Sequence, residues 1–163
     1  IGLKPTDIDF LIMTHTHIDH VGGIADFPQA PIVISQAERV LEYPLYWGDV
    51  HPIPWPEDVT YQPIEDDVEF CPGLTILVTP GHAPGQLSLL IRLPQTGNVL
   101  LTSDAISRPA EIEEKFDTAR DPDQAIASAD KLMEIAKREN AFIIYGHDPA
   151  QWETLRKAPD CYE

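Results

Sequence analysis

Four side chains of the kinds that bind metal ions lie within six consecutive positions, in the run 15–20, which reads His-Thr-His-Ile-Asp-His. This run follows residues 8–13, whose largely apolar composition predicts a short buried strand. Imidazole and carboxylate groups are ligands that suit zinc and similar divalent metals. An isolated histidine is more often an ordinary core or surface residue. Four such groups in one short loop are difficult to satisfy without a cation, so the run predicts a metal site.

Three more candidate ligands follow at long range, each after a predicted strand. They are His82 after residues 74–78, Asp104 after residues 99–101, and His147 after residues 141–145. Strand ends at one edge of a sheet can converge on a single point, and loops there tolerate irregular backbone. Gly22 and Gly23 follow the first run, and we expect these small residues to let the backbone approach a crowded site closely.

The apolar and helical segments predict an α/β fold. Further strands are expected at residues 31–34 and 87–93. Ser35 followed by Glu38 is a capping-box pattern, which predicts a helix to about residue 41. Asp121-Pro122 predicts the start of a second helix that ends near residue 140, and a short helix is expected at residues 152–157.

The remaining segments predict loops and surface. Residues 43–63 are rich in proline and aromatic side chains, which favours a long ordered loop. The acidic runs 65–67 and 111–114 are expected to be solvated. Within the loop, His51 is interpreted as a loop histidine, and Trp47 and Trp55 could either line a pocket or pack the loop against the body.

Composition excludes several classes of partner. The 163 residues are sufficient for one domain, 1–163, with a sizeable core. The net charge of −16 argues against nucleic acids and anionic membrane surfaces, which need clustered Lys and Arg. No segment is long and apolar enough to predict a membrane span. Cys71 and Cys161 lie far apart, which predicts two free thiols in a reducing compartment, with Cys71 buried.

The order of these motifs resembles that of the metallo-β-lactamase superfamily, and most closely its N-acyl-homoserine lactonases. The resemblance is carried by the run 14–23, by Thr79-Pro80-Gly81-His82 with its following residues, and by segments 100–105 and 146–163. It implies a metallo-β-lactamase-type αβ/βα sandwich from which the family's N-terminal strands are missing. It also implies a bacterial cytoplasmic protein, although an incomplete N-terminus leaves a signal peptide open.

The same resemblance implies a site for two divalent metal ions, with Zn²⁺ expected. His15, His17 and His82 would hold one ion, and Asp19, His20 and His147 the other, while Asp104 would bridge both. A hydroxide between the ions would open a lactone ring, and Asp19 or Asp104 could carry the proton to the leaving oxygen. The expected partner is a small lactone or ester, and a homodimer is left open.

Two positions depart from the lactonase pattern. Ser107 stands where those enzymes often carry a tyrosine that contacts the lactone carbonyl, and its hydroxyl has a shorter reach. Gln86 stands where a histidine is frequent, and we expect only a tuning effect. Asp148, next to His147, could orient a ligand or be solvated. Hydrolysis of thioesters, phosphotriesters or other esters stays open, as does metal binding without turnover.

Overall fold

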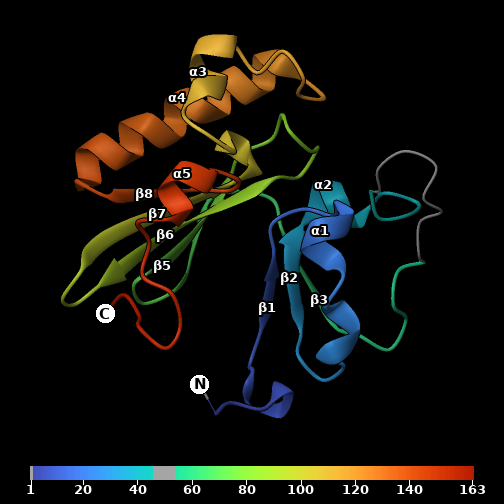
Figure 1. Ribbon diagram of the computed structural model, residues 1–163. Helices are drawn as coiled ribbons and strands as arrows, with labels where there is room; N and C mark the ends of the chain where they lie inside the picture. Colours follow the sequence, from blue (N-terminus) through green and yellow to red (C-terminus); the bar gives the residue numbers. More distant parts are fainter. Residues whose placement is uncertain (1, 46–53) are drawn as a thin grey trace.

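Two β-sheets pack face to face, with helices on their outer surfaces, in the computed structural model, which describes residues 2–45 and 54–163 (Figure 1). In the first sheet the described strands are all parallel and have the order β1 (Leu11–Met13), β2 (Ile32–Ser35), β3 (Tyr61–Ile64). The second sheet follows the chain order: β4 (Val68–Cys71), β5 (Leu74–Val78), β6 (Leu87–Leu93), β7 (Gly97–Ser103) and β8 (Phe142–Tyr145). Its pairs are antiparallel except β7 with β8, which is parallel.

The helices cover the outer faces of this sandwich. Next to the first sheet lie α1 (Ile18–Val21), the 3₁₀ turn η2 (Ile24–Asp26) and α2 (Gln36–Arg39). Over the second sheet lie α3 (Ala110–Glu114) and α4 (Pro122–Glu139), and α5 (Pro149–Trp152) follows β8. Two more 3₁₀ turns, η1 (Pro5–Asp7) and η3 (Asp104–Ile106), precede β1 and follow β7. No helix in these described ranges has the length and hydropathy needed to cross a membrane.

Three hydrophobic clusters hold the layers together. Val33, Ile76 and Leu87 are buried between the two sheets. On the opposite face of β2, Ile32 and Ile34 pack toward α1 and η2, since successive strand residues point to opposite faces. The third cluster lies between the second sheet and α3 and α4, and contains fully buried Leu100 and Leu132. This arrangement confirms the αβ/βα sandwich that the motif order implied.

Several predicted elements are confirmed and others are wrong. Strands 74–78 and 87–93 have the predicted bounds, whereas the first strand is shortened to Leu11–Met13. The predicted loop 43–63 contains the start of β3, which was missed because it carries Pro63. That proline is tolerated because β3 lies at the edge of its sheet. The acidic run 111–114 lies in α3, where Glu113 and Glu114 are exposed, as expected for a solvated run.

The helix expected at residues 152–157 is also wrong, because the chain forms α5 at Pro149–Trp152. The side chain of Asp148 accepts hydrogen bonds from the amides of Ala150 and Gln151, and Pro149 occupies the first helical turn. Both cysteines are free, as predicted, but Cys71 is exposed because it lies on the edge strand β4.

Candidate metal centre

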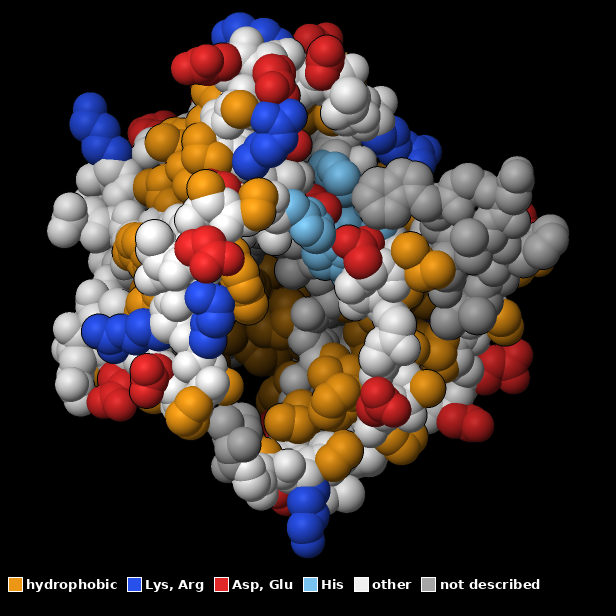
Figure 2. Space-filling view, viewed as in Figure 1, with side chains coloured by type: hydrophobic (Ala, Val, Ile, Leu, Met, Phe, Trp, Pro, Cys, Tyr) orange, Lys and Arg blue, Asp and Glu red, His pale blue; other side chains and the backbone are white. Residues whose placement is uncertain are grey.

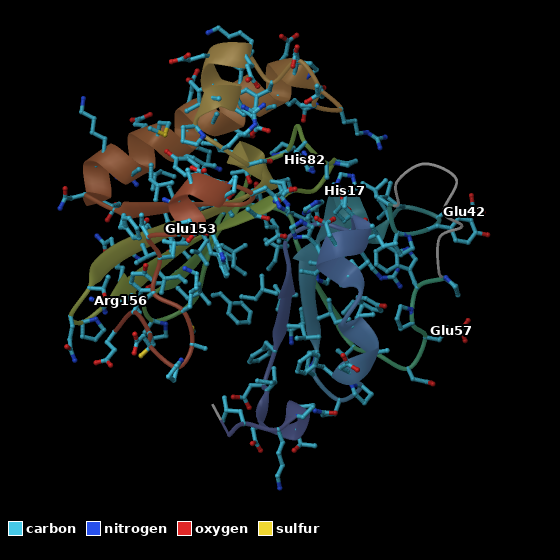
Figure 3. All side chains as sticks on the ribbon, viewed as in Figure 1. His17, Glu42, Glu57, His82, Glu153 and Arg156 are labelled. Carbon is cyan, nitrogen blue, oxygen red and sulfur yellow. The ribbon has the colours of Figure 1, made fainter. Side chains whose placement is uncertain are left out.

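All seven candidate ligands follow the C-terminal ends of strands, at one edge of the sandwich, and come from both sheets. His15, His17, Asp19 and His20 follow β1, with the last two in α1, and His82 follows β5. Asp104 begins η3 directly after β7, and His147 follows β8. The labelled His17 and His82 lie side by side at this edge (Figure 3). The histidines form one cluster on the surface in Figure 2.

A first group of ligands consists of three histidines from two loops. His17 Nδ1 lies 3.0 Å from His15 Nε2 and 2.9 Å from His82 Nε2. Ligand atoms of all three lie within 4.8 Å of one another, which is compact enough for one ion. The Nδ1 of His15 faces the hydroxyl of Thr14 at 3.3 Å, so the Nε2 is the nitrogen that faces the other rings.

A second group consists of Asp19, His20 and His147. The Oδ2 of Asp19 lies 3.3 Å from His20 Nε2 and 3.4 Å from His147 Nε2. These three residues also offer ligand atoms within 4.8 Å of one another. The side chains of His147 and Asp19 are 50% and 38% exposed, so this group is the accessible part of the centre.

Asp104 lies between the two groups. Its Oδ2 is 3.4 Å from His82 Nε2 in the first group and 3.2 Å from His147 Nε2 in the second. Its Oδ1 is 3.4 Å from His20 Nε2, and the residue is only 3% exposed. No other carboxylate among the described residues has ion-pair contacts to histidines of both groups. Asp104 is thus placed where a bridging ligand must lie, although its ligand role stays a prediction.

The buried polar atoms of the centre fit a metal site. His20 Nε2 and Asp104 Oδ1 are buried and have no hydrogen-bond partner among the described residues. Buried polar atoms are normally satisfied, and an orphaned pair at one point indicates a missing partner. A divalent cation would satisfy both atoms, and it would also separate the ring nitrogens that converge at about 3 Å in the first group.

The electrostatics favour the protonation states that bind metals. Burial lowers the pKa of His15 to about 2, with a further contribution from His20. Burial is also the main reason that the pKa values of His17 and His82 are lowered. Burial alone would raise the pKa of Asp104, but His20, His15 and His82 outweigh it and lower the value to about 2. Neutral imidazole and ionised carboxylate are the ligand forms.

His20 behaves differently from the other rings. Its burial opposes protonation, but Asp104 and Asp19 outweigh that effect and raise the pKa of His20. In the metal-free chain a protonated His20 would therefore partly neutralise Asp104 and Asp19. A bound metal ion would supply positive charge at the same place.

The backbone around the bridging position is strained and closely packed. Ser103, directly before Asp104, has φ of 47°, which is unfavourable for a residue with a side chain and typical of functional sites. A Cβ on Gly146 would lie 2.6 Å from the carbonyl oxygen of Ser103 and 2.9 Å from Asp104 Oδ1. Gly146 therefore allows the strand that carries His147 to approach Asp104.

The expectation that Gly22 and Gly23 relieve crowding is wrong. A Cβ on Gly22 would meet only the carbonyl oxygen of Ile18 at 3.5 Å, and one on Gly23 only Asp26 at 3.9 Å. The crowded glycines are instead Gly81 and Gly146, which directly precede His82 and His147, and Gly85, which follows His82 by three positions.

The other residues named from the sequence have clear positions. The amide of Ser107 donates to Glu111 Oε2 (2.7 Å), and its carbonyl accepts from the amide of His147 (2.8 Å). Gln86 is fully buried and donates to the carbonyl of Leu87. Trp55 packs against the body, because its indole donates to the carbonyl of Leu41. His51 and Trp47 lie outside the described residues.

Sequence reasoning missed one buried residue of the site, Glu38. Its carboxyl group was expected to complete a capping box, but in α2 only Ser35 caps, through the amide of Ala37. Glu38 instead bonds to Thr16 and Gly85, next to ligands. No local pattern signals this role, because the partners are 22 and 47 positions away.

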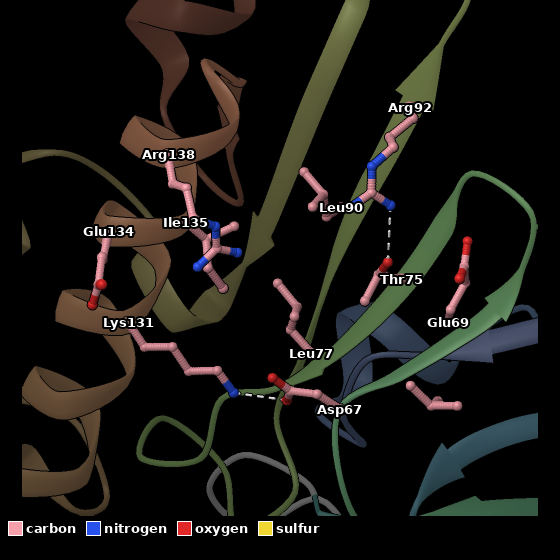
Figure 4. A pocket seen from close by; sticks show the side chains of 11 residues that line it. Asp67, Glu69, Thr75, Leu77, Leu90, Arg92, Lys131, Glu134, Ile135 and Arg138 are labelled. Atoms are coloured by element: carbon pink, nitrogen blue, oxygen red, sulfur yellow. Dashed lines mark hydrogen bonds and ion pairs between the residues drawn. The ribbon is translucent and has the colours of Figure 1, made fainter.

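A hollow of about 360 Å³ on the second sheet is separate from this centre. It lies between α4 and strands β4 to β6, and none of the seven candidate ligands lines it. Lys131 bonds to Asp67 across it, and Arg92 bonds to Thr75 (Figure 4). The Lys131–Asp67 ion pair crosses the hollow, which is a polar surface groove away from the candidate ligands.

Residues 1–147 match the family model of the metallo-beta-lactamase superfamily, and the chain belongs to this superfamily. It is similar to the N-acyl homoserine lactonase of Bacillus thuringiensis, with 35% identity over 98% of the chain and 64% of the relative. It also resembles the N-acyl homoserine lactonase AttM of Rhizobium radiobacter, with 33% identity over 99% of the chain and 66% of the relative. The chain thus spans about two thirds of the length of these relatives.

Solved structures agree with this placement. An N-acyl homoserine lactone hydrolase with the product N-hexanoyl-L-homoserine bound at its catalytic metal centre superposes with a TM-score of 0.83. That match has 34% identity and covers 98% of this chain and 63% of the other. AidC, a dizinc quorum-quenching lactonase, shares the fold with a TM-score of 0.70 at 21% identity, over 97% of this chain and 64% of the other.

Proposed function

We propose that this chain carries the centre of a two-metal hydrolase that opens the ring of N-acyl homoserine lactones, with Zn²⁺ as the metal. The observation that carries the proposal is the position of Asp104 between two compact ligand groups. The lactonases among its relatives support the choice of substrate. When bound, two divalent ions would polarise the ester carbonyl and make hydroxide available near neutral pH.

The side chains around the centre divide the remaining tasks. Asp104, almost fully buried, would hold the two halves of the centre together. Asp19 lies at the accessible side, with Oδ2 3.4 Å from His147 Nε2, and could hold a proton and deliver it to the leaving alkoxide oxygen. Ser107 precedes α3 and could hydrogen-bond the lactone carbonyl through its hydroxyl.

The surroundings of the centre favour a substrate with an apolar chain. A hollow of about 170 Å³ beside His20 is lined by apolar side chains that include Met13, Ile24 and Phe27. Another of about 450 Å³ beside His147 includes Trp152. Figure 2 shows the surface hollowed below the histidine cluster, with hydrophobic side chains in the hollow. A net charge of −16 disfavours polyanionic substrates.

The test is a substrate panel on protein with a measured metal content. The chain is reconstituted with Zn²⁺, its metal is counted, and ring opening of N-hexanoyl homoserine lactone is compared with hydrolysis of a thioester and a phosphotriester. Preferred turnover of the lactone supports the proposal. Two bound metals with preferred turnover of another substrate would assign the centre to a different ester hydrolase, a candidate that Ser107 keeps open. Two bound metals without turnover of any substrate would indicate a metal-binding protein that is not an enzyme.

A further inference from the structure

Glu38 is a buried acidic residue outside the seven candidate ligands. It belongs to the short helix α2 and has 0% exposure. A buried carboxyl group is costly unless hydrogen bonds satisfy its oxygens, so the partners of this group indicate why it is there.

Both partners of Glu38 lie in loops that carry candidate ligands. Its Oε2 accepts from the amide (3.1 Å) and the hydroxyl (2.6 Å) of Thr16. Its Oε1 accepts from the amide of Gly85 at 3.0 Å. Thr16 stands between His15 and His17, and Gly85 follows His82 by three positions. One carboxyl group therefore joins the two loops that supply the first ligand group.

The geometry leaves little freedom at this junction. The Thr16 hydroxyl oxygen accepts from the amide of Leu45 at 2.7 Å, so its hydrogen is available to point at Glu38. A Cβ on Gly85 would lie 2.5 Å from Ser35 Oγ and 2.7 Å from Glu38 Cγ. The start of α2 is thus pressed directly against the loop of His82.

We propose that Glu38 is a positioning residue, which holds the loops of His15–His17 and of His82 at the spacing that one metal ion requires. Its three hydrogen bonds do not reach the segments of Asp19, His20 or His147. Loss of Glu38 should therefore weaken the ion of the first group far more than the ion of the second. The inference rests on the metal-binding part of the proposed function and is independent of the substrate.

The test compares Glu38→Gln with Ser35→Ala. An amide side chain has one acceptor oxygen and an NH₂ donor, so Gln cannot accept all three hydrogen bonds. Ser35→Ala removes the cap of the same helix, the bond from the amide of Ala37 (3.2 Å), but no bond to either loop. For each variant the melting temperature, the number of bound Co²⁺ ions, the Co²⁺ affinity in chelator competition and the Co²⁺ absorption spectrum are measured.

For Glu38→Gln we expect one Co²⁺ to bind as in wild type and the other to bind about 10- to 100-fold more weakly, with an altered spectrum. Ser35→Ala should lower the melting temperature and still bind both ions with wild-type affinity. Equal affinities in the two variants would overturn the proposal, because Glu38 would then act only on the stability of α2. A wild-type chain that binds no Co²⁺ would overturn the proposed function as well.

A milder variant keeps the idea testable if Glu38→Gln does not fold. Thr16→Val preserves the shape of the side chain and removes one of the three hydrogen bonds to Glu38, together with the bond from the amide of Leu45. Thr16→Ser preserves the hydroxyl that makes both bonds. We expect several-fold weaker binding of one Co²⁺ in the valine variant and wild-type binding in the serine variant. Unchanged binding in the valine variant would contradict the proposal. A wild-type chain that binds two Co²⁺ ions but does not hydrolyse the lactone would contradict the proposed substrate and leave the role of Glu38 intact.

Discussion

Replacing Gly146 with alanine should disable the metal centre although every candidate ligand residue is retained. The added Cβ would lie 2.6 Å from the carbonyl oxygen of Ser103, 2.8 Å from its carbonyl carbon and 2.9 Å from Asp104 Oδ1. Non-bonded carbon atoms are comfortable at about 3.5–4.0 Å, so relief of the 2.8 Å contact requires β7 and β8 to separate locally by roughly 0.7–1.2 Å. Ser103 already has φ of 47°, so the backbone that would have to move is strained.

Two magnitudes follow from this displacement. Overpacking typically destabilises a protein by about 1–3 kcal/mol. At roughly 2–4 °C per kcal/mol for a chain of this size, the melting temperature should fall by about 2–12 °C. A displacement near 1 Å at a catalytic group can lower the rate about 100-fold, so kcat/KM should fall by about that factor. Since Asp104 faces both ligand groups, bound metal should fall as well.

The matched control is Gly22→Ala, next to the first ligand run. Its Cβ would meet only the carbonyl oxygen of Ile18 at 3.5 Å, and its φ of −57° suits any residue. Metal content by elemental analysis, melting temperature and lactone turnover are measured for both variants. Full metal content and wild-type kcat/KM in Gly146→Ala would refute the reasoning, as would equal damage in the two variants.

Three further outcomes are expected. Asp104→Asn should lose one metal and most activity. Asp148→Asn should change metal content and stability little, because the side-chain oxygen of asparagine can accept the same amide hydrogen bonds and caps a helix about as well as aspartate; similar metal counts in both variants would contradict the bridging assignment. The metal-free chain should lose stability as the pH falls below 6.5, because the pKa of His15 is about 2 in the folded chain and only the unfolded chain takes up the proton. The raised pKa of His20 partly offsets this loss. Melting temperatures measured across pH 5–8 give the net effect. Ser107→Tyr should raise lactonase kcat/KM about 10-fold if it adds one hydrogen bond of about 1.4 kcal/mol, and Ser107→Ala should change it little.

Local patterns were sufficient wherever the cause of a structure is local. Asp121 and Pro122 predict the start of α4 because capping and a fixed φ act within one turn. Local reasoning also predicts a capping box from Ser35 and Glu38. Ser35 does cap α2, but Glu38 does not complete the box. A buried carboxyl group can accept hydrogen bonds from donors anywhere in the chain. Glu38 accepts from the amides of Thr16 and Gly85 rather than from the amide of Ser35 at the start of its own helix.

Residue types alone predict the chemistry of the centre, because the run 15–20 and three isolated residues supply imidazole and carboxylate side chains after predicted strands. The way in which these side chains meet depends on how the layers pack. Asp104 lies between the two groups because β7 ends in a strained turn at Ser103 and because Gly146 lets β8 approach it. Such close contacts join segments more than 40 positions apart, and packing between layers, rather than local conformational preference, sets those distances.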